Sequence, residues 1–185
     1  DEWQDAPQLW NAVRYAVDQR GGEGHFIALL GKCADAPANA PAPYVAPARD
    51  PHRNEAAALY ADCFSDTPEG DFVTVGETVR LLPEGLPSLT GCGVRTAGLA
   101  VAAVCKNRLE PCHAAFLAAR GDACRRIYSF PADDARLTAF LRGEELAAPE
   151  QNGWTAIAVE GIPLGFGKAG GGRLKNRYPK GLRLL

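Results

Sequence analysis

Apolar and polar positions alternate in short runs along most of the chain, and helical spacing is confined to a few segments. Runs of about four to eight alternating or β-branched residues, bounded by glycine, proline or asparagine, are typical of short strands. Apolar residues at helical spacing predict helices at 54–64, 110–120 and 129–143. Strands are predicted within residues 11–17, 25–30, 72–82 (two strands and a tight turn), 94–105 (one or two strands, broken near Gly98), 126–130, 153–159 and 173–185.

The clearest predicted helix is at residues 129–143. Pro131 lies near its start, and Asp133 and Asp134 fall in its first turn, where the helix dipole favours negative charge. Gly143 is placed to end the helix. By contrast, residues 161–172 are so rich in glycine that we predict a turn region there rather than a regular element.

An Ala/Pro-rich stretch divides the chain. Four prolines from Pro37 to Pro47 exclude a helix interior and favour an extended, semi-stiff linker. The many short strands and few short helices after this stretch predict an α+β fold with a small C-terminal barrel. The predicted division is residues 1–33 with a two-stranded hairpin, a linker at 34–50, a first accessory region at 51–90 and a last domain at 91–185.

Composition narrows the class of protein. The 185 residues, 46% of them hydrophobic, suffice for one good core or two small ones. The chain has no Met and begins at Asp1, so we expect a fragment of a longer protein. No apolar run approaches the ~18–20 residues of a membrane helix, and we expect a soluble, cytoplasmic protein with no membrane partner. The six cysteines form no C-x-x-C pair, which favours reduced, buried thiols over a metal site.

Charge is distributed unevenly. The whole chain has a net charge of −2, but six basic residues and no acidic one fall between residues 168 and 183. Such a basic segment on an otherwise acidic protein is typical of phosphate binding. We expect Tyr178 to offer a ring for base stacking and Asn176 an amide for hydrogen bonding. The predicted nucleic-acid-binding residues are Lys168, Arg173, Lys175, Asn176, Arg177, Tyr178, Lys180 and Arg183.

Catalytic motifs are not satisfied. The glycine-rich stretch lacks the Ser or Thr that should follow Lys168 in a nucleotide-binding P-loop. Glu23 and His25 stand close enough for an acid–base pair, although neighbours within one turn are more often structural. Cys112 follows a proline but has no activating base at a known spacing, which favours a structural thiol. We therefore assign no catalytic residue to this segment.

Six segments carry a family resemblance: 22–29 (GEGHFIAL), 109–114 (LEPCHA), 138–143 (TAFLRG) with Glu144 and Leu146, 153–154 (GW), 161–168 (GIPLGFGK) and 174–183 (LKNRYPKGLR). They resemble one enzyme family, the RsmF-type ribosomal-RNA cytosine-5 methyltransferases. The C-terminal segments are the most specific part of the resemblance. Cys112 stands where the family usually has Ser, and Arg177 stands where His is common, which makes the cation permanent rather than pH-dependent.

The resemblance implies a fold and a role. The hairpin at 11–30 would be the last two strands of a Rossmann-like, S-adenosylmethionine-dependent domain, and the chain would end in a PUA-like β-barrel that binds RNA. The family's two catalytic cysteine motifs and its cofactor loop lie upstream, so we expect no cofactor in this segment. The implied partners are ribosomal RNA, in rRNA processing, and the upstream methyltransferase domain. The methylated nucleotide, the ribosomal subunit and the oligomeric state stay open.

Two further interpretations of the sequence remain beside the RNA-binding accessory region. The basic segment is also consistent with a stand-alone module that contacts a protein or ribosome surface without a specific RNA target, because basic runs are often only solvated surface. The third interpretation is a small enzyme that uses Glu23 and His25. A fall of RNA affinity with salt separates the first two interpretations, and turnover by this segment alone would favour the third.

Overall fold

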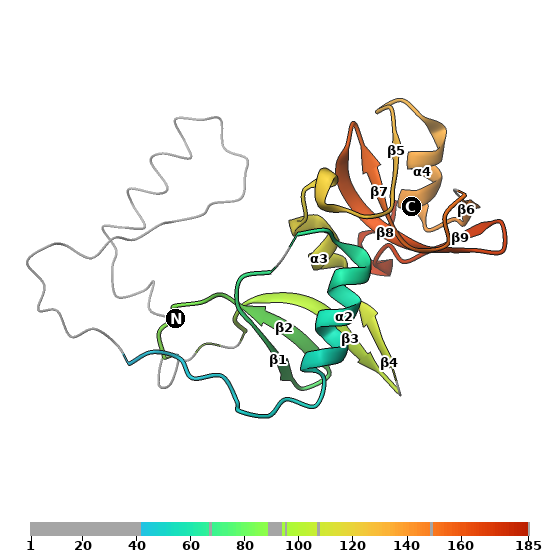
Figure 1. Ribbon diagram of the computed structural model, residues 1–185. Helices are drawn as coiled ribbons and strands as arrows, with labels where there is room; N and C mark the ends of the chain where they lie inside the picture. The colour runs from blue at the N-terminus through green and yellow to red at the C-terminus, as the bar shows by residue number, and fades with distance from the viewer. Residues whose placement is uncertain are drawn as a thin grey trace, which may run out of the picture. The chain divides into compact units, whose positions relative to one another are not determined.

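The computed structural model describes residues 42–66, 68–88, 94, 96–106, 108–148 and 150–184. Within these ranges the chain forms two β-sheets, each associated with helices (Figure 1), and they belong to one compact unit that begins at Pro41. The hairpin predicted at 11–30, the region predicted at 1–33, and Glu23 and His25 lie outside the described residues.

The first sheet is antiparallel, and its strands follow one another in chain order. The helix α2 packs on this sheet, and Ala56 and Cys63 are its buried residues. The helix predicted at 54–64 and the strand pair at 72–82 are confirmed, and the strand predicted within 94–105 begins directly after Gly98, at Leu99. The elements are α2 (Arg53–Cys63), β1 (Asp71–Val75), β2 (Thr78–Leu82), β3 (Leu99–Cys105) and β4 (Arg108–Pro111).

The second sheet is curled, with the spatial order β5-β7-β8-β9-β6. Its β5–β7 pair is parallel and its other pairs are antiparallel. The helix α4 (Ala135–Arg142) packs on it through Leu137 and Phe140. The two sheets with their helices confirm the predicted α+β class. The strands are β5 (Ile127–Phe130), β6 (Leu146–Ala147), β7 (Gly153–Val159), β8 (Ile162–Gly170) and β9 (Arg173–Asn176).

The turn region predicted at 161–172 is wrong, because most of it is β8, a strand of nine residues. Its glycines allow close packing within the sheet. A Cβ on Gly167 would overlap the Leu174 side chain and lie 2.8 Å from the Lys175 carbonyl oxygen. The turn itself is made by Gly171 and Gly172, whose φ angles are 59° and 76°.

Two predicted helices begin later than expected. Residues 108–111 pair with β3, so the helix predicted at 110–120 is the shorter α3 (His113–Ala118). The helix predicted at 129–143 begins only after Asp134, whose carboxylate accepts a hydrogen bond from the Arg136 amide at 2.9 Å. Its predicted end at Gly143 is confirmed, and φ there is 91°.

Apolar packing connects the two sheets. The first core lies among α2, the first sheet and α3, and it includes Trp154 and Phe166 of the second sheet. Phe116 of α3 stacks on Phe166 with 4.6 Å between ring centroids and 5° between ring planes. The second core lies between α4 and the second sheet, where Phe140 and Leu174 are fully buried. The shared core therefore favours a fixed arrangement of the two sheets.

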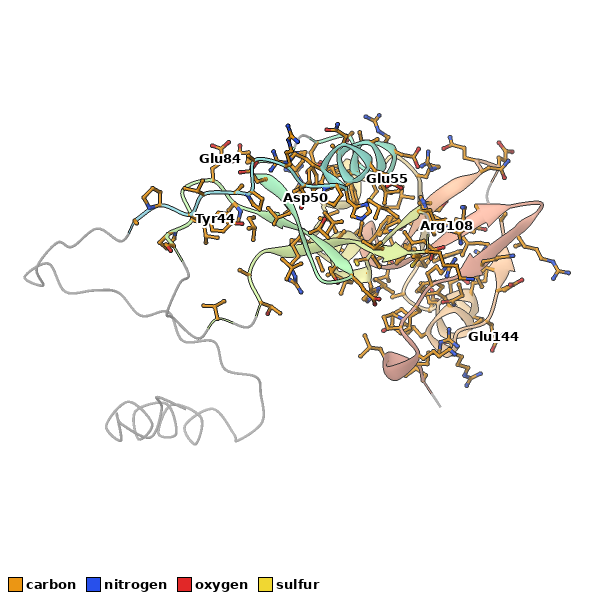
Figure 2. The ribbon with its side chains drawn as sticks, turned by 90° about the horizontal axis from the view of Figure 1, so that it is seen from below. Tyr44, Asp50, Glu55, Glu84, Arg108 and Glu144 are labelled. Carbon is orange, nitrogen blue, oxygen red and sulfur yellow. The ribbon has the colours of Figure 1, made fainter. Side chains whose placement is uncertain are left out.

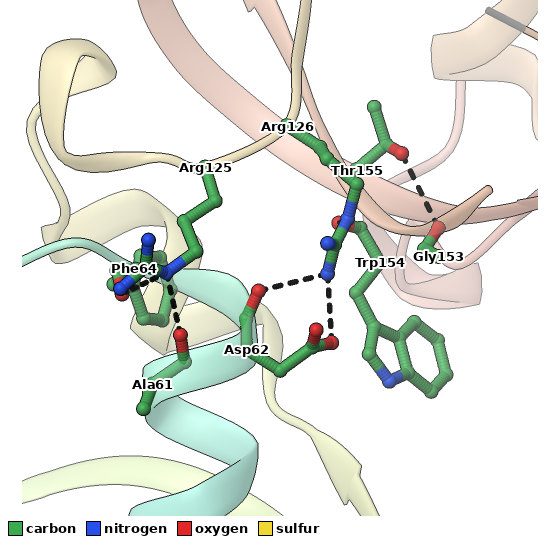
Figure 3. A network of polar contacts seen from close by, with 8 residues as sticks. All are labelled: Ala61, Asp62, Phe64, Arg125, Arg126, Gly153, Trp154 and Thr155. Carbon is green, nitrogen blue, oxygen red and sulfur yellow. Dashed lines mark hydrogen bonds and ion pairs between the residues drawn. The ribbon is translucent and has the colours of Figure 1, made fainter. Parts of the chain in front are cut away.

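Two consecutive arginines hold the end of α2 (Figure 3). The Arg125 Nε donates to the carbonyl oxygens of Ala61 and Phe64, at 2.6 and 3.0 Å. The Arg126 Nη2 donates to the carbonyl oxygen of Asp62 at 2.8 Å and to its carboxylate at 2.7 Å. The last carbonyls of a helix lack partners within the helix and carry partial negative charge. The segment that leads into β5 is thus fixed on α2.

The predicted division at residues 90 and 91 falls between β2 and β3, which pair with each other. The division itself stays a prediction. Among the helices of the described residues, none is both long enough and apolar enough to cross a membrane.

Candidate nucleic-acid interface

Four cations of the predicted set share one face of the β8–β9 hairpin. Lys168 lies opposite Lys175 in the register, and Gly170 lies opposite Arg173. Side chains two residues apart on a strand point to the same side, and the Arg177 amide still donates to the Phe166 carbonyl beyond the end of β9. We call Lys168, Arg173, Lys175 and Arg177 the basic face; all four are exposed.

An aromatic side chain supports the basic face. Trp154 of β7 lies opposite Lys168 in the register, and the residue is buried, with 7% of its surface exposed. The Lys168 Nζ is 4.7 Å from the centre of the indole ring, and the Arg177 Cζ is 5.8 Å from it. Cation–π attraction at such distances orients the two cations without neutralising them.

Two carboxylates border the basic face. The Arg177 Nη2 is 3.3 Å from both carboxylate oxygens of Glu110 on β4. The Arg173 Nη1 is 3.7 Å from the Glu145 Oε2, and these two side chains are 77% and 47% exposed. An exposed pair of this kind contributes little and is screened by salt. The basic face therefore keeps an excess of positive charge.

Asn176 and Tyr178 point to the other side of β9. The Asn176 Nδ2 donates to the carbonyl oxygens of Phe140 and Glu144, at 2.8 and 2.9 Å, and its Oδ1 accepts from the Tyr178 amide at 2.7 Å. Tyr178 makes edge contacts with the rings of Phe140 and His113, with 5.5 and 5.3 Å between centroids. The amide and the ring predicted to contact bases are thus engaged in packing at the end of α4.

The last two predicted residues differ from each other. The Arg183 guanidinium packs over Gly143 at the end of α4, where a Cβ would overlap it, and its Nη2 donates to the Tyr178 carbonyl at 3.4 Å. A cation there complements the helix dipole. Lys180 is exposed in the short 3₁₀ turn η3 (Lys180–Leu182). The structure therefore gathers Lys168, Arg173, Lys175 and Arg177 on one face and separates them from Asn176, Tyr178 and Arg183.

Sequence reasoning missed three residues beside the basic face: Trp154, Arg108 and Glu110. The Arg108 Nη2 is 2.6 Å from the Glu110 Oε1, and the Arg108 side chain is 68% exposed. Figure 2 labels Arg108 among the side chains drawn as sticks. Residue 110 was predicted to begin a helix, so the alternation that places Arg108 and Glu110 on the same side of β4 was not recognised. Nothing in the sequence showed that Arg177, far along the chain, reaches the same carboxylate.

Two features of the described residues bear on metal binding and on nucleophilic chemistry. They contain no group of three His, Cys, Asp or Glu side chains that could hold a metal ion. Burial raises the pKa of the Cys112 thiol, which keeps it protonated and weakly nucleophilic at neutral pH.

Two family models match the chain on either side of the paired arginines. Residues 59–118, from α2 to α3, match the RsmF rRNA methyltransferase first C-terminal domain. Residues 128–184, from β5 to the end of the described chain, match the Methyltransferase RsmF PUA domain.

The chain is an RsmF-type C-terminal region. This confirms the resemblance drawn from the sequence, including the PUA-like character of the curled second sheet. Arg125 and Arg126 lie between the two matched ranges, and the basic face lies within the PUA domain. An RsmF first C-terminal domain followed by a PUA domain implies an RNA-binding region of an rRNA methyltransferase.

Proposed function

We propose that this region holds ribosomal RNA for an S-adenosylmethionine-dependent cytosine-5 methyltransferase, whose catalytic domain lies upstream. The basic face of the PUA domain carries the proposal, because four exposed cations share one side of one hairpin there. Lys and Arg side chains bind RNA mainly through phosphates, and each phosphate contact releases counterions.

Contacts to the RNA outside the catalytic pocket would assist methylation by offsetting the cost of exposing the target base. A cytosine within a folded RNA must leave its stack before a catalytic pocket can reach it, which costs a few kcal/mol. Contacts to backbone and shape elsewhere on the RNA supply binding energy that offsets this cost. The basic face would supply such contacts to phosphates, because its four side chains are cations.

The remaining parts of the proposal concern the parent enzyme. S-adenosylmethionine would bind to the upstream domain, and no described residue is assigned to it. Our proposal further includes that the parent enzyme acts in the cytoplasm, with ribosomal RNA as its substrate. A methyl-transfer assay with the parent enzyme, followed by mass spectrometry of the nucleosides, tests the cytosine-5 assignment: 5-methylcytidine is expected, and any other methylated nucleoside contradicts it.

RNA binding by this chain is tested by titrating a structured ribosomal-RNA fragment at several salt concentrations. We expect affinity to fall steeply with salt, and Lys175→Ala to weaken binding and reduce the slope of log K against log salt by about one. Arg142→Ala is the matched control. Arg142 is an exposed cation at the end of α4, and α4 packs on the opposite side of the second sheet from the basic face. Binding that is insensitive to salt, or equal effects of both variants, would contradict the proposal.

A further inference from the structure

We propose that the RNA-binding surface crosses from the PUA domain onto the first C-terminal domain, where Arg108 and Arg177 together bind one phosphate of the RNA backbone. This rests on the proposed function, and it adds a second domain and a residue outside the basic segment. The observation that carries it is the carboxylate of Glu110, which both arginines contact.

Both contacts are close and come from different elements. Arg108 and Glu110 lie on β4 of the first domain, with 2.6 Å between Nη2 and Oε1. Arg177 follows β9 of the PUA domain, and its Nη2 lies 3.3 Å from each oxygen of the same carboxylate. Two guanidinium groups from two matched domains therefore meet at one point.

The charges at this point do not cancel. One carboxylate faces two guanidinium groups, so one positive charge remains. Each guanidinium has five N–H donors, and in each only Nη2 is bonded to Glu110. The Glu110 side chain is 15% exposed, whereas those of Arg108 and Arg177 are 68% and 39% exposed. Solvent therefore reaches the cations more than the anion, which suits an incoming phosphate.

The position of the two arginines is set before RNA arrives. The Arg177 guanidinium is also held near the Trp154 ring, and the stack of Phe116 on Phe166 joins the two domains. Arg125 and Arg126 fix the connecting segment on α2 (Figure 3). Groups that are already ordered lose less conformational entropy on binding, so a preformed pair binds a phosphate more strongly than two free side chains.

The chemistry favours a phosphodiester backbone over an acidic protein surface. Arg177 belongs to the row of cations that shares one face of the hairpin with Lys168 and Lys175, and Arg108 of β4 meets Arg177 at Glu110. A repeating line of single negative charges fits a row of cations, and such contacts position RNA without reading its sequence. We therefore expect the pair to act on RNAs of different sequence alike.

The test uses this chain, a stem–loop RNA probe and the variants Arg108→Gln, Arg177→Gln and their combination. Loss of one phosphate contact should weaken binding about five- to tenfold at about 0.1 M salt and lower the salt slope by about one. Because both arginines bind the same phosphate, the double variant should lose little more than either single variant. Arg120→Gln is the matched control, since Arg120 also pairs with a carboxylate two residues further on, Asp122.

Three outcomes would overturn the inference: wild-type RNA affinity of Arg108→Gln, equal loss in Arg120→Gln, or a double variant whose loss is the product of the two single losses.

Lys168→Gln and Lys175→Gln distinguish this failure from failure of the proposed function. If they weaken binding while Arg108→Gln does not, the PUA domain binds RNA alone. If Arg108→Gln, Arg177→Gln, Lys168→Gln and Lys175→Gln all bind RNA as the wild type does, the proposed function fails as well. Arg108→Lys keeps the positive charge but lacks the planar, forked guanidinium group. Its RNA affinity should therefore lie between those of Arg108→Gln and the wild type. Thermal melting confirms that each variant is folded.

Discussion

The two faces of the β9 strand have opposite characters, although their residues alternate in the sequence. Arg173, Lys175 and Arg177 are exposed. Lys175 lies opposite Lys168 on the neighbouring strand, and the Arg177 guanidinium lies over the Trp154 ring. Leu174 is fully buried, and Asn176 is bonded to the end of α4. One continuous segment thus separates into a charged surface and a structural side.

This difference shows why a basic segment is a poor unit of function. On a strand, neighbouring residues point to opposite sides, so one segment contributes to two environments. The packed side holds the hairpin on α4, and the exposed side presents cations in a fixed row. Substitutions on the two sides should therefore separate stability from RNA affinity.

Leu174→Ala should have the largest effect on stability. Leu174 has no exposed surface and packs in the core between α4 and the second sheet. Removing a buried leucine side chain and leaving a cavity costs about 2–5 kcal/mol of unfolding free energy. Urea denaturation measures it, with Leu184→Ala as control because Leu184 is 50% exposed. Equal stability of the two variants would show that the core is not where the structure places it.

Asn176→Ala should have the next largest effect. The variant leaves the carbonyls of Phe140 and Glu144 and the amide of Tyr178 without their side-chain partner. An unsatisfied, partly buried polar group costs about 1–3 kcal/mol, and this site has several, so we expect a loss in the upper part of that range. Denaturation and RNA titration should be run together. A stable variant with weakened RNA binding would reverse the assignment and make Asn176 an RNA contact.

Alkaline pH should lower stability through packed groups rather than through the basic face. Burial raises the pKa of Tyr60 and Cys63 to about 12 and that of Cys124 to about 11. Each folded-state pKa exceeds its unfolded value, so the folded protein retains protons that the unfolded chain releases. Their stabilisation is complete below about pH 9 and is lost as pH rises toward 12.

Melting temperature against pH measures this alkaline loss. The slope should be the same in the wild type and in Lys175→Gln, because Lys175 is exposed and lies away from the three acids. A melting temperature that stays constant between about pH 9 and pH 11 would contradict the burial of these groups.

Lys175→Gln should have the smallest effect on stability. Surface substitutions away from special features usually change the unfolding free energy by about 0.5 kcal/mol or less. The same variant should nevertheless reduce the salt slope of RNA binding by about one. Denaturation and titration of one preparation give both values. A destabilised variant with unchanged RNA binding would place Lys175 on the structural side.

Much of the fold follows from local pattern. The short apolar run at 153–159 predicted β7, and Gly143 predicted the end of α4, because both signals act over a few neighbours. The glycine-rich β8 was mistaken for a turn, since glycine serves both turns and close packing. Only the partner strand decides between these uses: Leu174 and Lys175 occupy the space that a Cβ on Gly167 would need.

The candidate site was predictable only in part. The excess of cations near the C-terminus was visible in the sequence, and four of them form the basic face. The RNA-binding roles predicted for Asn176 and Tyr178 did not take into account that side chains alternate between the two faces of a strand. This alternation places both residues against α4. The meeting of Arg177 with Glu110 depends on the packing of two domains, which no local pattern encodes.

Lysine footprinting tests the central claim most directly. The amines of this chain would be modified with and without a saturating stem–loop RNA, and mass spectrometry would report each lysine. We predict that Lys168 and Lys175, which lie opposite each other on the basic face, lose most of their reactivity together when RNA is bound. If both remain as reactive with RNA as without it, RNA does not bind this face and the account is wrong.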